Sequence, residues 1–280
     1  MIKQQVAQLL ATVNVAVTKR DTFDRVIQNE RNFQRYEAFL SFADNVNSDY
    51  VKRALNLLPS SKGEIFQDIF AALCSTPGKQ GFFVEFGATD GVNGNNTWLL
   101  EKTLGWHGIL AEPARIWRSS LANNRNCMIT HDCVWRKTGH NLEFTQASDA
   151  GFSSLSDYAD KDRHAQRRAG GNTYTVQTVS LDDLLKRSNA PKLIDYISID
   201  TEGSEYDILS NFSFSDWNIS ILTVEHNFRE DRMAIHELMK ANGFVRVLTK
   251  LSQFDDWYVA AQLLPRVEAV FDLSEDMVAQ

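Results

Sequence analysis

Residues 80–91 read QGFFVEFGATDG. An apolar run that contains Glu85 ends at Gly87, and Gly91 follows four positions later. Short apolar runs bounded by glycines are typical of buried strands, and a glycine directly after a strand lets another group approach the backbone closely. The stretch therefore predicts a buried strand whose carboxyl end forms part of a binding site.

Beyond residue 80, strand patterns alternate with helical patterns. Strands are predicted in GFFVEFG, GILAEP, CMITHDCVW, LEFTQA, YTVQTVS, DYISIDTEG, ISILTVEHN, FVRVLT and WYVAAQL. Helices fit between most of them, over residues 95–104, 114–123, 181–188, 204–210 and 229–242. This alternation predicts a doubly wound α/β fold with a mainly parallel, seven-stranded sheet. Because no helix separates the last two strands, we expect them to form an antiparallel hairpin at one edge.

The first 58 residues contain neither proline nor glycine, so nothing there interrupts a helix. Apolar residues recur in this part at helical spacing in two sets, namely Val6, Leu9, Leu10 and Val13, and then Val51, Ala54, Leu55 and Leu58. We predict a helical extension over residues 1–62, an α/β domain over 63–265 and a tail over 266–280. Because exposed apolar stripes favour association, the extension is expected to pack on the domain or on a second copy of the chain, which would make a homo-oligomer.

Composition argues against several classes of protein. The net charge of −7 and the pI near 5.4 argue against nucleic-acid binding, which usually requires a basic face. Three cysteines without a CxxC pair argue against a disulfide framework or a zinc site, and they indicate a reducing compartment, which we take to be the cytoplasm. The apolar stretch near the N-terminus is broken by Gln and Asn, so we expect neither a signal peptide nor a membrane span.

Polar residues gather where the predicted parallel strands end. Ligands of open α/β sheets bind at the carboxyl ends of the strands, so these residues mark the expected site. Some polar side chains are expected at any solvent-facing strand end, but a charge inside an apolar run is costly unless it is paired. The residues at these ends are Gly87, Asp90, Glu112, Asp200, Glu202, Glu225 and His226.

The glycine spacing after the first strand fits neither a dinucleotide fingerprint nor a P-loop. Its pattern E-x-G-x-x-x-G, followed by Glu112 at the end of the next strand, resembles class I S-adenosylmethionine-dependent methyltransferases. The segments FQDIF, GFFVEFGATDGVNGNNTWLLEKTLGW, GILAEP, VQTVSLDDLL, IDYISIDTEGSEYDIL and LTVEHN resemble the FkbM family of methyltransferases. The most specific of them is SIDTEGSEYDIL. Asn95-Asn96-Thr97 departs from the Ser-Asn-Thr that many members carry.

The resemblance implies which residues contact the cofactor. The glycine turn would lie along the methionine end of S-adenosylmethionine, and Glu112 would bind the ribose hydroxyls. Residues after the third strand would lie near the adenine. The cofactor-binding residues implied in this way are Glu85, Gly87, Ala88, Asp90, Gly91, Asn96, Thr97, Glu112, Pro113, Asp132, Cys133 and Asp200.

The resemblance also implies methyl transfer to a hydroxyl group of a sugar, a glycan or another small natural product. Such a reaction needs an aligned hydroxyl and a group that removes its proton, for which His226, Glu202 and Asp200 are the candidates. His226 has a competing interpretation as a strand-end residue that bonds a neighbour. Another alternative is a divalent metal, magnesium or manganese, held by Asp200, Glu225 and His226.

Further alternatives stay open at this point. A methyltransferase-like domain can lack activity and serve as a binding or scaffold module. The basic segment 160–171, with Arg163, His164, Arg167 and Arg168, is interpreted as a solvated helix and loop, with phosphate binding as the alternative. The polar loop GFSSL, residues 151–155, is of a kind that often contacts substrate.

Overall fold

A computed structural model describes residues 20–160 and 164–274 of the protein. The chain divides into two compact units, residues 1–44 and 45–280. The first unit contains helix α2 (Arg20–Ala43), on which Phe33, Tyr36 and Leu40 are exposed at helical spacing. The predicted helical stripe of Val6, Leu9, Leu10 and Val13 lies outside the described residues.

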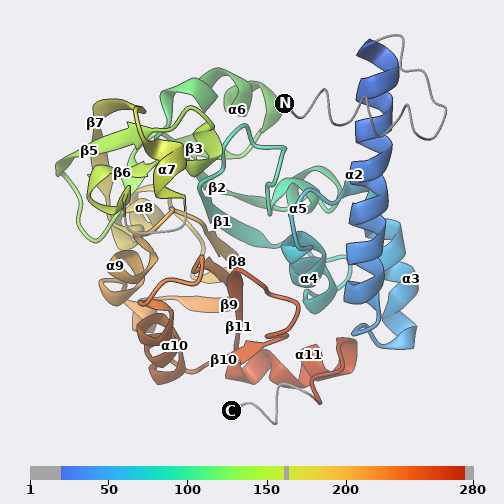
Figure 1. Ribbon diagram of the computed structural model, residues 1–280. Coiled ribbons are helices and arrows are strands. Elements are labelled where there is room, and N and C mark those ends of the chain that lie inside the picture. The colour runs from blue at the N-terminus through green and yellow to red at the C-terminus, as the bar shows by residue number, and fades with distance from the viewer. Residues whose placement is uncertain (1–19, 161–163, 275–280) are drawn as a thin grey trace. The chain divides into compact units, whose positions relative to one another are not determined.

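The second unit is built on a seven-stranded sheet with the strand order β10-β11-β9-β8-β1-β2-β3 (Figure 1). Strand β11 is antiparallel to both β9 and β10, and the other neighbours in the sheet are parallel. The predicted mainly parallel sheet and its antiparallel edge hairpin are therefore confirmed. The strands are β1 (Phe82–Phe86), β2 (His107–Ala111), β3 (Met128–Thr130), β8 (Leu193–Ile199), β9 (Asn218–Glu225), β10 (Phe244–Val247) and β11 (Asp255–Ala260).

Helices precede or connect most of these strands, as expected of a doubly wound fold. Each of the five helices predicted beyond residue 80 is present, although most are shorter than expected. The helix predicted over 95–104, for example, begins only at Trp98. The helices of this unit are α3 (Ser48–Leu57), α4 (Gln67–Cys74), α5 (Trp98–Lys102), α6 (Arg118–Asn124), α7 (Ala165–Arg168), α8 (Leu181–Arg187), α9 (Glu205–Ser210), α10 (Arg232–Ala241) and α11 (Leu264–Val270).

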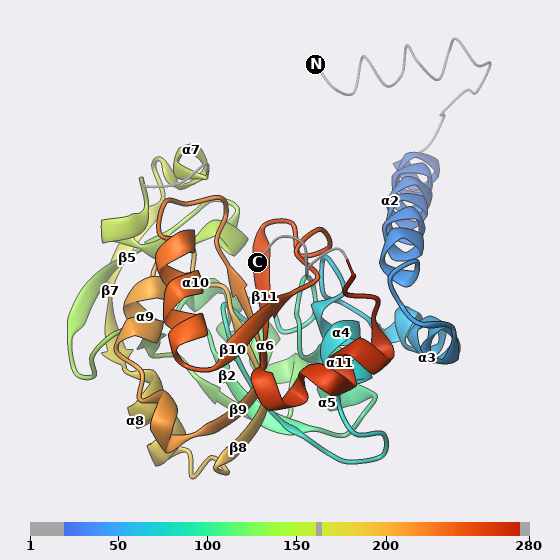
Figure 2. The ribbon, with the colours of Figure 1, turned by 90° about the horizontal axis from the view of Figure 1, so that it is seen from below.

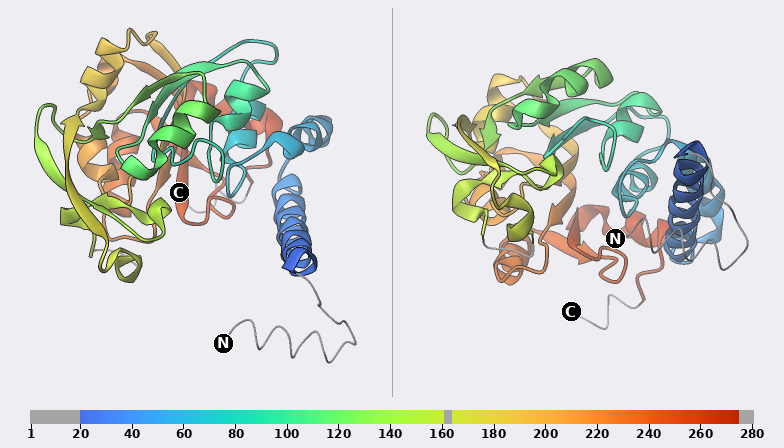
Figure 3. Two further views of the ribbon diagram at one scale, coloured as in Figure 1. Left: turned by 90° about the horizontal axis from the view of Figure 1, so that it is seen from above. Right: turned by 45° about the horizontal axis from the view of Figure 1, so that its top comes forward.

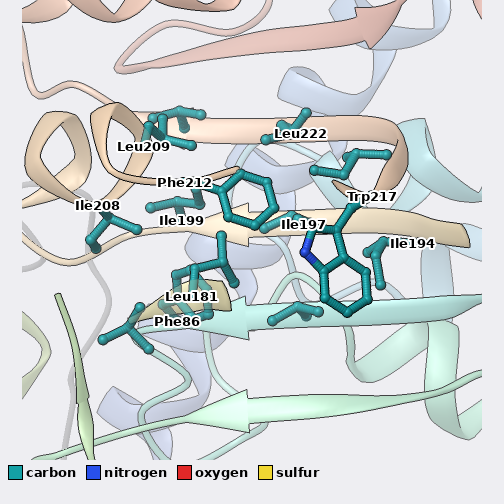
Figure 4. Packing of buried hydrophobic residues seen from close by; sticks show 14 of the residues in the cluster. Phe86, Leu181, Ile194, Ile197, Ile199, Ile208, Leu209, Phe212, Trp217 and Leu222 are labelled. Carbon is teal, nitrogen blue, oxygen red and sulfur yellow. The ribbon is translucent and has the colours of Figure 1, made fainter. Parts of the chain in front are cut away.

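The two faces of the main sheet are covered by different helices (Figure 2). Because successive side chains of a strand point to opposite faces, Ile197 and Ile199 of β8 join the core under α8, α9 and α10. Leu181, Ile208 and Leu209 from α8 and α9 fill that core (Figure 4). On the opposite face, Phe70 of α4 stacks on Trp257 of β11 with ring centroids 4.7 Å apart. Burial on both faces explains why these strands read as continuous apolar runs.

A second sheet, of four strands, was not predicted as a separate unit. Its order is β4-β7-β5-β6, and β5 and β7 lie to one side of the main sheet (yellow-green in Figure 3). The single strand predicted over CMITHDCVW is wrong, because Met128–Thr130 pairs with β2 whereas Cys133 and Val134 pair with β7. The four strands are β4 (Cys133–Val134), β5 (Asn141–Gln146), β6 (Ser154–Leu155) and β7 (Asn172–Val179).

Residues just after α2 are tied to the end of the chain. The side chain of Asn47 donates hydrogen bonds to the carbonyl groups of Glu268 (3.1 Å) and Ala269 (3.0 Å), and Val46 forms a β-bridge with Phe271. Helix α3 therefore lies in the second unit, although the sequence placed it in the N-terminal extension. The segment predicted as a tail from residue 266 includes most of α11, whose following residue Phe271 is buried.

Candidate functional site

Gly87 lies at the point where three strands end together. Its backbone has a φ of +77°, and its N–H donates to the carbonyl of Ala111 on β2 (3.1 Å). A Cβ atom at this position would lie 2.0 Å from the carbonyl oxygen of Asp200, which follows β8. Both the left-handed φ and the close backbone approach require glycine here. The glycine inferred from sequence thus positions Asp200 beside the end of β1.

Glu85 is a buried residue that connects two elements next to the site. Its carboxylate accepts hydrogen bonds from the backbone N–H of Asn96 (2.8 Å) and from the hydroxyl of Thr97. Arg125 donates to the same hydroxyl (2.9 Å), and Glu85 is almost fully buried. Burial raises the pKa of Glu85, and the charge of Arg125 opposes that rise. Glu85 therefore joins β1 to the start of α5 through bonds within the protein, and neither it nor Thr97 lines the cavities described below.

The turn after Gly87 is closed by Asp90. One oxygen of its carboxylate accepts from the N–H groups of Val92 (2.8 Å) and Asn93 (2.9 Å). At Gly91, where φ is +79°, a Cβ atom would collide with the side chains of α6. These contacts hold the backbone of residues 87–93 in one conformation, which is what a binding loop requires.

A narrow pocket lies against the end of β2. Glu112 borders it and is 4% exposed, with its carboxylate accepting from the N–H groups of Thr89 (2.8 Å) and Ala114 (2.7 Å). Burial raises the pKa of Glu112 to about 7. Pro113 and Cys133 line the same pocket, as do Gly151, Ser153 and Leu155 from the loop GFSSL that the sequence had indicated. Sequence reasoning did not single out three further lining residues, namely Val134, Phe144 and Ala150.

The narrow pocket adjoins a wide cleft of about 530 Å³. The cleft is lined by Asp90, Asn96 and Glu225, and by Glu64, Gln67, Phe254 and Asp255, which sequence reasoning missed. A group bound in one cavity can react with a group bound in the other only where the two cavities share lining residues. The residues that line both are Gly87, Thr89, Gly151, Asp200 and Glu202.

Three carboxylates meet at this junction. Asp200, Glu202 and Glu225 each place an oxygen within 4.8 Å of the others. Burial raises the pKa values of Asp200 and Glu225 well above their ordinary values, and the carboxylates reinforce this by mutual repulsion. Asp200 and Glu225 also form a hydrogen bond with each other, and such a bond requires that one of the two carboxyl groups carries a proton.

Glu202 differs from its two neighbours because it has a cationic partner. Its carboxylate forms an ion pair of 2.7 Å with Arg168, whose side chain is also buried. Glu202 has a φ of +56°, an unfavourable conformation for a residue with a side chain. Arg168 belongs to the basic segment 160–171, so that segment is not simply a solvated helix and loop. His164 and Arg167 line the wide cleft, and Arg163 lies outside the described residues.

His226 lies outside the lining of both cavities. It is 2% exposed, its Nδ1 accepts from the N–H of Phe228 (3.0 Å), and its Nε2 therefore donates to the carbonyl of Asp255 (3.0 Å). Burial lowers the pKa of His226 and favours the neutral ring. Both ring nitrogens are engaged within the protein, which favours the interpretation of His226 as a strand-end residue that bonds a neighbour over its alternative roles as base or metal ligand.

Two further predicted contacts lie away from the cavities. Asp132 is paired with Arg187 at 2.5 Å, and Ala88 is buried. Neither residue belongs to the lining of the narrow pocket or the wide cleft. No helix within residues 20–160 and 164–274 is long and apolar enough to cross a membrane.

Comparison with known proteins gives one family match. The model for the methyltransferase FkbM domain matches residues 85–258, and no curated protein matches the chain. Among solved structures, an O-methyltransferase from Bacillus cereus in complex with SAH has a TM-score of 0.36 and 15% identity, covering 92% of this chain and 98% of its own. A precorrin-6y C5,15-methyltransferase from Geobacter metallireducens has a TM-score of 0.35 and 8% identity, with 69% and 85% covered. The fibrillarin pre-rRNA processing protein of Methanococcus jannaschii has a TM-score of 0.34 and 12% identity, with 71% and 74% covered.

Proposed function

Because the chain belongs to the FkbM methyltransferase family, we propose that it transfers a methyl group from S-adenosylmethionine to a hydroxyl oxygen of a small polyhydroxylated acceptor, such as a sugar or glycan. The observation that carries the cofactor assignment is Glu112 at the end of β2, beside the exposed turn at Gly87. A carboxylate there accepts hydrogen bonds from a ribose diol, and each of its oxygens keeps a lone pair after bonding a backbone N–H.

The remaining lining of the narrow pocket suits an adenine ring. Val134, Phe144 and Leu155, all from the second sheet, supply an apolar wall to the pocket that Glu112 lines. The pocket holds about 40 Å³ of free space, which is close to one water molecule and smaller than a purine. We therefore propose that side chains of this wall move outward when the adenine binds.

The junction of the two cavities suits the reacting groups. S-adenosylmethionine supplies an electrophilic methyl group on a cationic sulfonium, and the carboxylates of Asp200, Glu202 and Glu225 favour a cation there by charge. We assign Asp200 as the group that accepts the hydroxyl proton, since it lines both cavities and its hydrogen bond with Glu225 opposes the rise in its pKa caused by burial and so favours the ionised form that a base requires. The ion pair of Glu202 with Arg168 fixes the position of the Glu202 carboxylate at this junction.

The carboxylates do not fit a resident metal as the sequence suggested. His226 has no free ring nitrogen, and Glu202 is already paired with the guanidinium of Arg168. Asp200 and Glu225 are hydrogen-bonded to each other, and a metal ion would have to displace the proton of that bond before both could act as ligands. We therefore propose proton transfer to a carboxylate, and expect methyl transfer to survive exhaustive chelation.

A labelled methyl group gives the direct test of this function. The purified protein is incubated with methyl-labelled S-adenosylmethionine and a panel of glycosides, and the products are analysed by mass spectrometry and NMR. We expect an O-methylated glycoside, together with S-adenosylhomocysteine, and loss of both in Asp200→Asn. If the protein binds the cofactor but methylates no hydroxyl, either in the panel or in extracts of its source cells, the alternative of an inactive binding or scaffold module is correct.

A further inference from the structure

The chain just before the family-matched region builds one wall of the wide cleft. Residues 61–68 lead into the first turn of α4 and lie outside the match to residues 85–258. Asp68 is fully buried, and its carboxylate accepts hydrogen bonds from the hydroxyl of Ser61 and from the N–H groups of Lys62, Gly63 and Ile69. Phe66 has a φ of +68°. Such a conformation persists only where surrounding contacts enforce it, so this wall is rigid.

The rigid wall presents Gln67 to the cleft. The Gln67 side chain is 3% exposed, and its Oε1 accepts from the N–H of Ile65 (3.1 Å). Its Nε2 donates to Oδ2 of Asp255 (2.9 Å), a residue 188 positions away that is 4% exposed. Asp255 stands opposite Glu225 in the antiparallel pairing of β11 with β9. The first residue of β11 thus joins the edge where the parallel strands end.

A buried amide next to this pair lacks a partner. Asn96 lines the cleft, is 8% exposed and donates to the hydroxyl of Ser198 (3.0 Å). Its Oδ1 has no hydrogen-bond partner among the described residues. Gly63 leaves room for that amide, because a Cβ on Gly63 would lie 2.8 Å from Oδ1. A buried amide atom without a partner is costly, and a ligand hydroxyl in the cleft would satisfy it.

We infer that Gln67, Asp255 and Asn96 form the acceptor-recognition subsite, and that it selects uncharged hydroxyl-bearing groups over phosphorylated or carboxylated ones. This inference rests on the proposed methyl transfer to a hydroxyl. Amide and carboxyl groups offer both donors and acceptors, which is the chemistry that binds neighbouring hydroxyls. Phe254 supplies an apolar surface against which one face of a sugar ring can pack.

The charges around the subsite disfavour an anion. Glu64 and Glu225 line the cleft beside Asp255, and the only basic side chains among the described lining residues are His164 and Arg167. Arg167 is half-exposed and lies 3.6 Å from Asp149. An added phosphate or carboxylate on the acceptor would therefore face carboxylates, while Arg167 is already paired with Asp149, and the anion would lose hydration with little compensation.

The test measures acceptor binding to the protein saturated with S-adenosylhomocysteine, by saturation-transfer NMR. The probes are methyl glycosides of glucose, mannose, galactose and rhamnose, with glucose 6-phosphate and glucuronate as anionic counterparts. We expect at least one uncharged glycoside to bind at least tenfold more tightly than the anionic probes, and Gln67→Leu to weaken it about tenfold or more. Gln262→Leu, an exposed Gln outside the cleft, is the matched control and should leave binding unchanged.

A charge change at the same position gives a second, independent readout. Gln67→Lys should pair with Asp255 and improve binding of glucose 6-phosphate relative to the uncharged glycosides. Calorimetric titration with S-adenosylhomocysteine verifies that each variant is folded and binds cofactor as the wild type does. Tighter binding of the anionic probes by the wild type, or no selective effect of the Gln67 variants, overturns the subsite. Failure to bind S-adenosylhomocysteine at all would instead overturn the proposed function.

Discussion

The carbonyl oxygen of Asp200 occupies space that only a glycine at position 87 leaves open, since a Cβ there would lie 2.0 Å from it. We expect Gly87→Ala to displace the end of β8 and to abolish cofactor binding. The strained φ alone costs about 1–3 kcal/mol, and the clash with backbone adds to this cost. Gly78→Ala is a matched control, because Gly78 has a similar φ of +75° but nothing lies within 4 Å of its added Cβ. Equal losses of stability and of affinity in the two variants would contradict the proposed role of the contact.

The raised pKa of Glu112 leads us to expect that cofactor affinity depends on pH. Burial raises the pKa of Glu112 to about 7, so its carboxyl group is mostly protonated at pH 6 and mostly ionised at pH 8. Hydrogen bonds to an ionised carboxylate are stronger than those to a neutral group. The Kd for S-adenosylhomocysteine should therefore rise several-fold as the pH falls from about 8 to about 6, given the usual strength of such bonds. In Glu112→Gln the Kd should be higher than in the wild type and nearly independent of pH across this range. A Kd that changes with pH as steeply as that of the wild type would contradict the assignment.

Asp200 and His226 should behave differently when they are replaced. We expect Asp200→Asn to lower kcat at least a hundredfold while S-adenosylhomocysteine still binds, because loss of a general base typically has an effect of about this size. We expect His226→Ala to lower the free energy of unfolding by about 1–3 kcal/mol, because it removes the partners of the Phe228 N–H and of the buried carbonyl of Asp255. Stopped-flow turnover and thermal melts separate the two effects. An inactive but fully stable His226→Ala protein would restore His226 as the base.

The exposed stripe on α2 predicts self-association. Phe33, Tyr36 and Leu40 are 59%, 60% and 63% exposed, and exposed apolar residues at this spacing favour pairing with another apolar surface. We predict that the full-length chain forms a homo-oligomer and that replacing all three residues with serine yields a monomer. Light scattering coupled to size-exclusion chromatography measures the mass in solution. A wild-type monomer, or an oligomer that survives the triple substitution, would contradict this prediction.

The main sheet could be predicted from sequence because its strands are buried on both faces. Runs such as YISI in β8 and SILTV in β9 are mostly apolar and do not alternate strictly with polar residues, which is typical of strands covered on both faces. The second sheet could not be separated from it. Its strand β7 alternates polar with apolar residues, which indicates a strand but does not reveal the strand with which it pairs.

The part of the site that could be predicted from sequence consists of residues at the carboxyl ends of parallel strands. Gly87, Glu112 and Asp200 lie at the ends of parallel strands, and the structure brings them together around the two cavities. Gln67 and Asp255 were missed for different reasons. Gln67 precedes the first strand, and Asp255 begins an antiparallel strand, so neither lies at the end of a parallel strand. For His226 the sequence left the roles of base, metal ligand and strand-end residue open, because a residue beside a strand end can point into the cleft or away from it and sequence does not show that direction.

Calorimetric titration with S-adenosylhomocysteine tests the central claim most directly. We predict micromolar binding by the wild-type protein and a loss of at least tenfold in Glu112→Ala, since a ribose diol bonded to a buried carboxylate contributes about 1.5–3 kcal/mol. The melting temperature of the variant identifies any loss that comes from unfolding. Absence of binding to the wild type, or an unchanged affinity in folded Glu112→Ala, would contradict the account of the pocket at the end of β2.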